Sequence, residues 1–198
     1  MKIRQKIFLV VLPLIILPLG ISQAASYAAA IRGINRAARE FFDFKNSELQ
    51  KYTENQWNLL VENGYAGRPD MVEAAQNAVE IYAKSIVLSD TEIIFAVNEA
   101  GDLVMATSDL RILPAEKEKL LDLVGDEAPG LLQARIGGKD RVFSSFWFTP
   151  FGWHLVLSED RDQFYQDADS ITVFTFITLG VASAAAIVLL FFFTRFLT

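Results

Sequence analysis

The sequence predicts an α+β fold in which a five-stranded antiparallel sheet and a long N-terminal helix are flanked by two transmembrane helices. Two uncharged runs, residues 7–30 and 171–194, lie near the two ends of the 198-residue chain. Helical periodicity dominates residues 32–87, and an alternation with period two begins at Thr91. No repeat or low-complexity linker divides the middle, so one domain of ordinary size fits between the runs.

The run at residues 171–194 is the strongest membrane signal. About 24 residues, at about 1.5 Å of rise each, are enough to cross a hydrocarbon core of about 30 Å. A single segment in lipid must be helical because the bilayer offers its backbone no water. We expect a second transmembrane helix at residues 7–31. A cleaved signal peptide ending around residues 23–26 is the alternative.

Charge is distributed unevenly along the chain. The part between the two runs holds all 24 acidic residues and 14 of the 18 basic ones, a formal charge of −10. Basic residues tend to stay on the cytoplasmic side of a membrane. We therefore expect residues 1–6 and 195–198 in the cytoplasm, and residues 32–170 on the outer side of the membrane. An acidic outer domain argues against nucleic acid as a partner.

Two helices are expected before the sheet. Residues 32–62 have an amphipathic pattern, and this helix would continue directly out of the first membrane span. The Asn63-Gly64 pair and the residues up to Asp70 are typical of turns. Pro69 suits the first turn of a helix over residues 69–87, where its missing N–H costs little.

The second half of the domain predicts the sheet. A helix is expected at residues 113–124, and we place all helices on one face of the sheet. Ser158 is expected to cap a last helix, with Glu159, Asp160 and Asp162 near its positive end. Strands are expected at residues 92–97, 102–107, 131–136, 141–148 and 153–157, with turns at 98–101, 137–138 and 149–152.

Three stretches resemble a known family. They are the long helix leaving the first span, IIFAVNEAGDLVMATSD at residues 93–109, and FTPFGWHLVLSED at residues 148–160. Together they resemble a single Cache domain, the PAS-like extracytoplasmic sensor module of bacterial receptors, over about residues 32–170. Residues 193–198 resemble the entry to a HAMP linker. The resemblance therefore implies a longer receptor with a cytoplasmic output domain.

No catalytic or metal-binding motif is found. His154 is the single histidine, so a site such as H-E-x-x-H is impossible, and no G-x-S-x-G sequence occurs. The absence of cysteine excludes disulfides, thiolate metal sites and cysteine catalysis. We expect no enzyme activity in this chain and no cofactor. His154 is expected to be a partly exposed strand residue facing away from Trp153, with pH sensing as the alternative.

The resemblance implies a pocket for a small molecule between the sheet and the elements that cover it. An arginine there would bind a carboxylate ligand with two parallel hydrogen bonds. Each candidate also has an ordinary interpretation, as a core residue or as solvated surface. The Arg-x-Trp pattern for amino-acid capture is absent, which argues against amino acids as ligands. From the positions of the predicted helices and strands, the residues that line this pocket would be Tyr82, Ser108, Arg111, Arg135 and Phe146.

Small residues recur every four positions in both uncharged runs. They allow two helix backbones to approach closely in lipid. We expect helix packing there, and a homodimer that uses residues 32–62 as well as the spans. The positions are Gly20, Ala24 and Ala28 in the first run, and Gly180 and Ala184 in the second.

Together these features predict the input module of a bacterial signal-transduction receptor. A small molecule would bind the outer domain, bias two arrangements of the exit helix, and shift residues 171–194. The cytoplasmic output would be a histidine kinase, a nucleotide cyclase or a chemotaxis domain. The alternative is a non-signalling membrane protein whose outer domain binds a protein partner.

Overall fold

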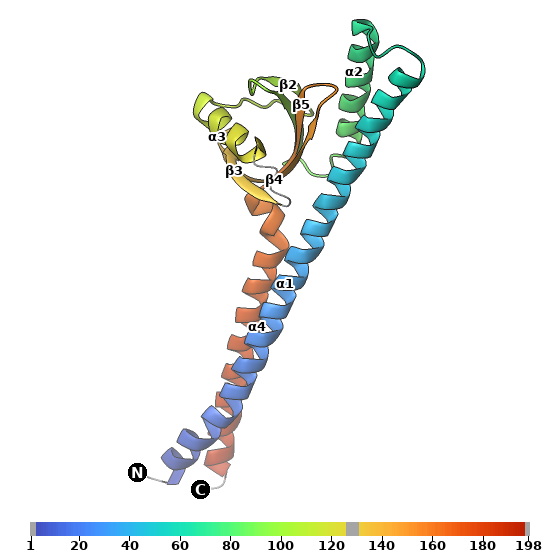
Figure 1. Cartoon of the computed structure of the whole chain (residues 1–198). Coiled ribbons are helices and arrows are strands. Elements are labelled where there is room, and N and C mark those ends of the chain that lie inside the picture. The colour runs from blue at the N-terminus through green and yellow to red at the C-terminus, as the bar shows by residue number, and fades with distance from the viewer. Residues whose placement is uncertain (1–2, 126–130, 197–198) are drawn as a thin grey trace. The chain divides into compact units, whose positions relative to one another are not determined.

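The computed structural model describes residues 3–125 and 131–196, and the chain divides into two compact units. One unit comprises Ala37–Phe164 and contains the sheet. The other comprises Met1–Arg36 and Tyr165–Thr198, and its described residues are helical. Figure 1 shows the elements and labels them in chain order.

The two longest helices contain the uncharged runs. Helix α1 extends from Ile3 to Glu62 without interruption, and helix α4 extends from Arg161 to Phe196. The predicted continuation of the first run into the helix at residues 32–62 is confirmed. Of the helices in the described residues, none combines the length and the hydropathy that a membrane crossing requires.

The predicted five-stranded antiparallel sheet is confirmed. Its strand order is β2-β1-β5-β4-β3, so the last strand in sequence lies in the middle of the sheet (Figure 1). Every strand lies within two residues of its expected bounds except β5, which is longer. The strands are β1 (Ile93–Asn98), β2 (Leu103–Ala106), β3 (Leu132–Ile136), β4 (Lys139–Phe148) and β5 (Trp153–Asp160).

The placement of all helices on one face of the sheet was wrong. Helix α1 and helix α2 (Pro69–Ile86) cover one face, whereas helix α3 (Pro114–Gly125) covers the other (Figure 1). The reason is visible in β1, where five consecutive residues are buried. Side chains alternate between faces along a strand, so such a run requires cover on both sides.

The first face is packed by residues that come from distant parts of the chain. Phe42 and Leu49 of α1 and Val79 of α2 join Ile94 and Leu157 in one buried cluster. We call this the α1/α2 face.

The second face is packed by Leu120 and Val124 of α3, which meet Phe95, Phe143 and Val156. We call it the α3 face. Burial of both sets removes large apolar side chains from water, at about 1.5–3 kcal/mol for each one that is fully buried.

The expected cap at Ser158 was also wrong. Strand β5 continues to Asp160 because both of its neighbours supply pairing partners there: Ile93 pairs with Ser158, and Arg141 pairs with Asp160. The Ser158 hydroxyl donates to the Ile93 carbonyl oxygen at 2.9 Å instead of capping a helix. Helix α4 begins at Arg161, and an Asp160 carboxylate oxygen accepts from the Asp162 N–H at 3.0 Å.

Candidate functional site

Two of the five predicted ligand residues lie in the same core cluster. Tyr82 of α2 and Phe146 of β4 are half-buried and pack on the α1/α2 face. The Tyr82 ring stacks on the Tyr52 ring of α1 with centroids 4.0 Å apart and planes 9° from parallel. Both residues therefore help to join the helices to the sheet.

The other three predicted ligand residues are exposed and belong to other elements. Ser108 and Arg111 lie between β2 and α3, and Arg135 lies on β3. Arg135 pairs in register with Asp140 of β4. Alternation along β4 places Asp140 and Phe146 on one face, so Arg135 shares the face of Phe146.

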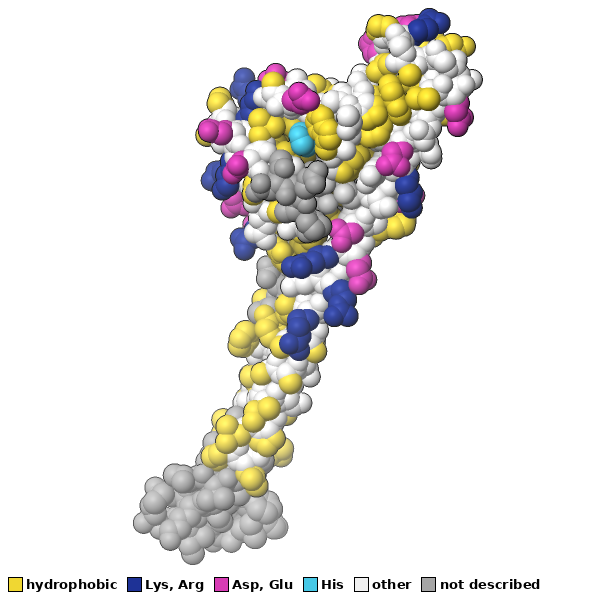
Figure 2. Space-filling model, viewed as in Figure 1, with side chains coloured by type: hydrophobic (Ala, Val, Ile, Leu, Met, Phe, Trp, Pro, Cys, Tyr) yellow, Lys and Arg dark blue, Asp and Glu magenta, His cyan; other side chains and the backbone are white. Residues whose placement is uncertain are grey.

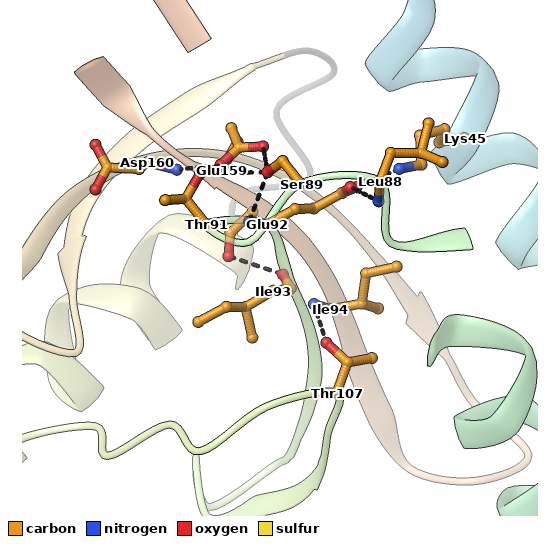
Figure 3. Close-up of polar contacts among 11 residues, drawn as sticks. Lys45, Leu88, Ser89, Thr91, Glu92, Ile93, Ile94, Thr107, Glu159 and Asp160 are labelled. Atoms are coloured by element: carbon orange, nitrogen blue, oxygen red, sulfur yellow. Dashed lines mark hydrogen bonds and ion pairs between the residues drawn. The ribbon is translucent and has the colours of Figure 1, made fainter. Parts of the chain in front are cut away.

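A polar cluster that the sequence did not predict lies where α1, the segment between α2 and β1, and the end of β5 converge (Figure 3). Its first part is an ion pair between Lys45 of α1 and Glu92. Both side chains are nearly inaccessible to water, at 6% and 4% exposure. The second Glu92 oxygen accepts from the Leu88 N–H at 2.8 Å. A buried charge requires such partners because its desolvation is costly.

The second part of the cluster holds the end of the central strand. Glu159 lies on β5, and its carboxylate accepts from the hydroxyls of Ser89, at 2.6 Å, and Thr91. It also accepts from the N–H of Asp160 at 2.9 Å. The Ser89 hydroxyl oxygen in turn accepts from the Glu92 N–H at 3.0 Å. Figure 3 shows that the segment 88–92 thus reaches α1 on one side and β5 on the other.

Arg141 of β4 completes the cluster. One of its terminal nitrogens donates to the Thr91 carbonyl oxygen at 2.9 Å and to the Ser158 hydroxyl at 3.3 Å. Burial lowers the pKa of Arg141, and the nearby carboxylates of Asp160 and Glu159 oppose that change. The guanidinium therefore sits beside compensating negative charge at the end of β5.

On the opposite side of the sheet, the buried carboxylate of Glu116 binds only backbone N–H groups in the contacts that the structure describes. It accepts from Gly137 at 2.9 Å, Gly138 at 3.0 Å and Leu113 at 3.2 Å. Both glycines have positive φ, 62° and 77°, as the two-residue turn between β3 and β4 requires. Glu116 thereby joins the start of α3 to that turn.

His154 lies on β5 and faces away from Trp153, as expected. Its ring is 4.4 Å from the Trp147 ring, and its Nδ1 has no hydrogen-bond partner in the described part of the chain. Burial lowers the pKa of His154, and the negative charge of Glu99 partly opposes this. The neutral imidazole is therefore the favoured form in the folded protein.

The hydrogen bonds of these groups connect elements that are far apart in the sequence. Within residues 3–125 and 131–196, no three His, Cys, Asp or Glu side chains converge on a point suited to a metal ion. The carboxylates of the cluster are all engaged by cations, hydroxyls or N–H groups. The cluster thus connects α1, the segment 88–92 and the end of β5.

One sequence signal for the cluster was present. Lys45 lies three residues after Phe42 and four before Leu49, so it occupies the buried stripe of α1. A lysine in such a stripe requires a buried partner. The identity of that partner was not predictable, because Glu92 is 47 residues away.

Comparisons with known proteins give structural matches and no sequence-based ones. No family model and no curated protein matches the chain. A methyl-accepting chemotaxis protein from Vibrio parahaemolyticus matches in structure with a TM-score of 0.40 and 15% identity, over 67% of this chain and 99% of that one.

Two further solved structures also match with a TM-score of 0.40. A Cache chemosensory domain, described in terms of carboxylic acid recognition, has 17% identity over 62% of this chain and 97% of its own. A periplasmic sensor domain of a chemotaxis protein has 12% identity over 61% of this chain and 97% of its own.

Proposed function

We propose that this chain is the sensor input module of a bacterial membrane receptor, which binds a small molecule outside the cell membrane and passes a conformational change along α4. The observation that carries this proposal is the connection between β5 and α4. Strand β5 ends at Asp160 and helix α4 begins at Arg161, with no linker between them.

The position of β5 in the sheet allows a change in the sheet to reach α4. It is the middle strand, and it pairs with β1 over Ile93–Asn98 and with β4 over Arg141–Phe148. A strand paired on both sides moves with its sheet, because independent sliding would break two ladders of hydrogen bonds. A ligand that binds one arrangement of the sheet more tightly would therefore bias the position of the first turn of α4.

Membrane attachment is supported by the two uncharged runs and by the side chains exposed on them. Many large apolar residues there are more than half exposed, and Figure 2 shows hydrophobic side chains on the described surface of this part of α1 and α4. Exposed apolar surface of this kind requires a lipid or protein environment. Examples are Leu14 at 71%, Ile21 at 68%, Phe174 at 72% and Phe192 at 64% exposure.

For the ligand we propose the α1/α2 face, with Tyr82 and Phe146 as the aromatic contacts and Arg135 as the residue that recognises a carboxylate. Ser108 and Arg111 remain the less direct candidates, since both are exposed between β2 and α3. A planar guanidinium fits a carboxylate with two hydrogen bonds, which gives such a site orientation as well as affinity.

Binding is tested with the whole chain in lipid nanodiscs. Thermal unfolding is followed while acetate, pyruvate, succinate, citrate and uncharged amide analogues are added in turn. We expect one carboxylate to raise the midpoint in a concentration-dependent way. Arg135→Gln should abolish that shift without changing the midpoint of the free protein. A shift that persists in Arg135→Gln would remove this residue from the site.

The topology and the receptor class need separate tests. Alkaline phosphatase fused after residue 110 should be active, because residues 32–170 are proposed to lie outside the cytoplasm. Fluorescence of a GFP fusion at that position, with an inactive phosphatase fusion, would contradict the proposal. A chimera that joins residue 196 to the HAMP and kinase portion of another receptor should then respond to the ligand found above.

A protein-binding role is the second candidate, and exposed apolar residues on the sheet-bearing unit favour it. Phe44 is 61%, Ile81 69% and Leu88 73% exposed in this single chain. A homodimer is the partner we propose first. Since the chain has no cysteine, Ile34→Cys gives an unambiguous disulfide crosslink in membranes if α1 meets its copy there. Crosslinking without any ligand response in the chimera would favour the non-signalling alternative.

A further inference from the structure

We propose that the short segment between α2 and β1, residues 87–92, couples α1 to the start of α4. This inference rests on the proposed function, because it names the route by which a movement of α1 reaches the exit helix. The segment carries one buried carboxylate, Glu92, which binds α1, and its hydroxyls bind a second one, Glu159 of β5 (Figure 3).

The first connection joins the segment to α1. Lys45 is buried in the stripe that α1 turns toward the sheet, and its ammonium group binds the Glu92 carboxylate. Because both side chains are nearly inaccessible to water, displacement of α1 separates two buried charges unless Glu92 follows. If the contact at this position were purely apolar, α1 could slide past Glu92 at a much lower cost in free energy.

The second connection joins the segment to the end of β5. Ser89 and Thr91 donate their hydroxyl hydrogens to the two oxygens of Glu159, and Glu159 lies two residues before the first residue of α4. Glu159 is itself buried, at 8% exposure. It is therefore held in a defined orientation by both hydroxyls and by the Asp160 N–H.

The segment between these connections is braced along its own backbone. The Glu92 N–H donates to the Ser89 hydroxyl at 3.0 Å and lies 3.3 Å from the Ser89 carbonyl oxygen. The Leu88 N–H binds the same Glu92 carboxylate that holds Lys45. Arg141 binds the Thr91 carbonyl oxygen. A six-residue segment with these bonds moves as a unit, so a pull on Glu92 displaces Ser89 and Thr91 as well.

A direct contact between α1 and α4 also exists and must be separated from this route. The Phe42 ring meets the Phe164 ring edge to face with centroids 5.5 Å apart. That contact is apolar and tolerates sliding and rotation better than the directed bonds at Glu92 and Glu159. The two routes predict different results when the hydroxyls of Ser89 and Thr91 are removed.

The test is amide hydrogen exchange of the full chain in nanodiscs, read by mass spectrometry for peptides that cover residues 159–164, 41–49 and 88–92. Lys45→Met removes the charge but keeps an unbranched side chain of similar length. We expect it to accelerate exchange at 159–164 by about fivefold or more. In a Ser89→Ala, Thr91→Val background, Lys45→Met should produce no further acceleration there.

The matched control is Glu116→Gln, which weakens a buried carboxylate contact on the α3 face. It should leave exchange at 159–164 unchanged, so that general destabilisation is separated from coupling. Because coupling is reciprocal, the Ser89→Ala, Thr91→Val variant should itself accelerate exchange at 41–49. If Lys45→Met fails to fold, exchange at 41–49 in this double variant tests the coupling by itself.

Two results would overturn the inference. In Lys45→Met, exchange at 159–164 could stay unchanged while acceleration is confined to 88–92. That result would mean that the segment rearranges locally and does not pass a movement of α1 to α4. An equal effect of Lys45→Met with and without the two hydroxyls would assign the coupling to Phe42 and Phe164. Neither measurement uses a ligand or an output domain, so failure of the coupling is distinguishable from failure of the receptor function.

Discussion

The two faces of the sheet are closed in different ways. On the α3 face, α3 is adjacent in sequence to β2 and β3, and the Glu116 carboxylate binds backbone N–H groups of Leu113, Gly137 and Gly138. On the α1/α2 face, the cover comes from helices that precede the sheet. A buried carboxylate there, Glu92, is held by the side chain of Lys45, 47 residues away, and by the Leu88 N–H.

This difference indicates which face can change its arrangement. Backbone N–H groups at a tight turn have a fixed geometry, so Glu116 has one favourable position. A lysine side chain has four rotatable bonds and reaches its carboxylate from a helix that continues toward the first uncharged run. We therefore regard the α3 face as a fixed support and the α1/α2 face as the adjustable one.

The largest effect should come from breaking the buried pair on the adjustable face. Glu92→Gln leaves the Lys45 ammonium buried beside a neutral amide, and we expect a loss of about 3–5 kcal/mol in the free energy of unfolding. Urea denaturation measures it. Lys51→Ala removes the exposed pair with Glu48 on the same helix and should have no measurable effect. If Glu92→Gln lowered the free energy of unfolding as little as Lys51→Ala does, groups other than Lys45 would account for the stability at this position.

A cavity on each face should give similar losses of stability but different functional results. Leu49 on α1 and Leu120 on α3 are almost fully buried, so each change to alanine should cost about 2–5 kcal/mol. Only Leu49→Ala is expected to alter the basal activity of a kinase chimera, because α1 belongs to the adjustable face. Equal changes in activity for the two variants would contradict the distinction between the faces.

Glu116→Gln should have a smaller effect. The amide retains one carbonyl oxygen but loses the second acceptor, so at least one of the three N–H groups is left without a partner. We expect a loss of about 1–3 kcal/mol, measured by urea denaturation. Glu118→Gln, at an exposed position of the same helix, is the control and should leave stability unchanged. If both variants behave alike, Glu116 does not support the α3 face.

The smallest effect should be a pH dependence from His154. Burial lowers its pKa below the ordinary value of 6.5, so the unfolded chain binds the proton more readily than the folded protein. Stability from this residue is therefore present above about pH 6.5 and is lost as the pH falls below that value. The wild type should lose more stability than His154→Gln between about pH 7.5 and about pH 5.5. Parallel losses would exclude His154 as the source.

The order of helices and strands was largely predictable from local patterns. The change of periodicity near Thr91 indicated where the helices end and the strands begin. Turn glycines indicated the hairpins, and the φ of 75° at Gly101 explains why glycine is needed at that turn. These features depend on neighbouring residues, so the sequence alone carries them.

The end of β5 shows where local patterns failed. Ser158, Glu159 and Asp160 resemble the start of a helix, and by local propensity they would cap one. Strands β1 and β4 extend the sheet past them, and the hydrogen bonds gained by pairing outweigh the local preference. The five proposed ligand residues stay a prediction. They come from α2, β3, β4 and the loop between β2 and α3, and Tyr82 and Phe146 pack on the same core cluster.

The sequence by itself determined the uncharged ends, the acidic middle, and the succession of long helices and short strands, because composition and periodicity act over a few residues. Only the tertiary structure decided that α3 covers the face opposite α1 and α2. The tertiary structure also showed that Lys45 binds Glu92, and that Ser89 and Thr91 bind Glu159. Such pairs form between residues far apart in the chain, and they are selected by the geometry of the folded core, in which a buried charge must find a partner.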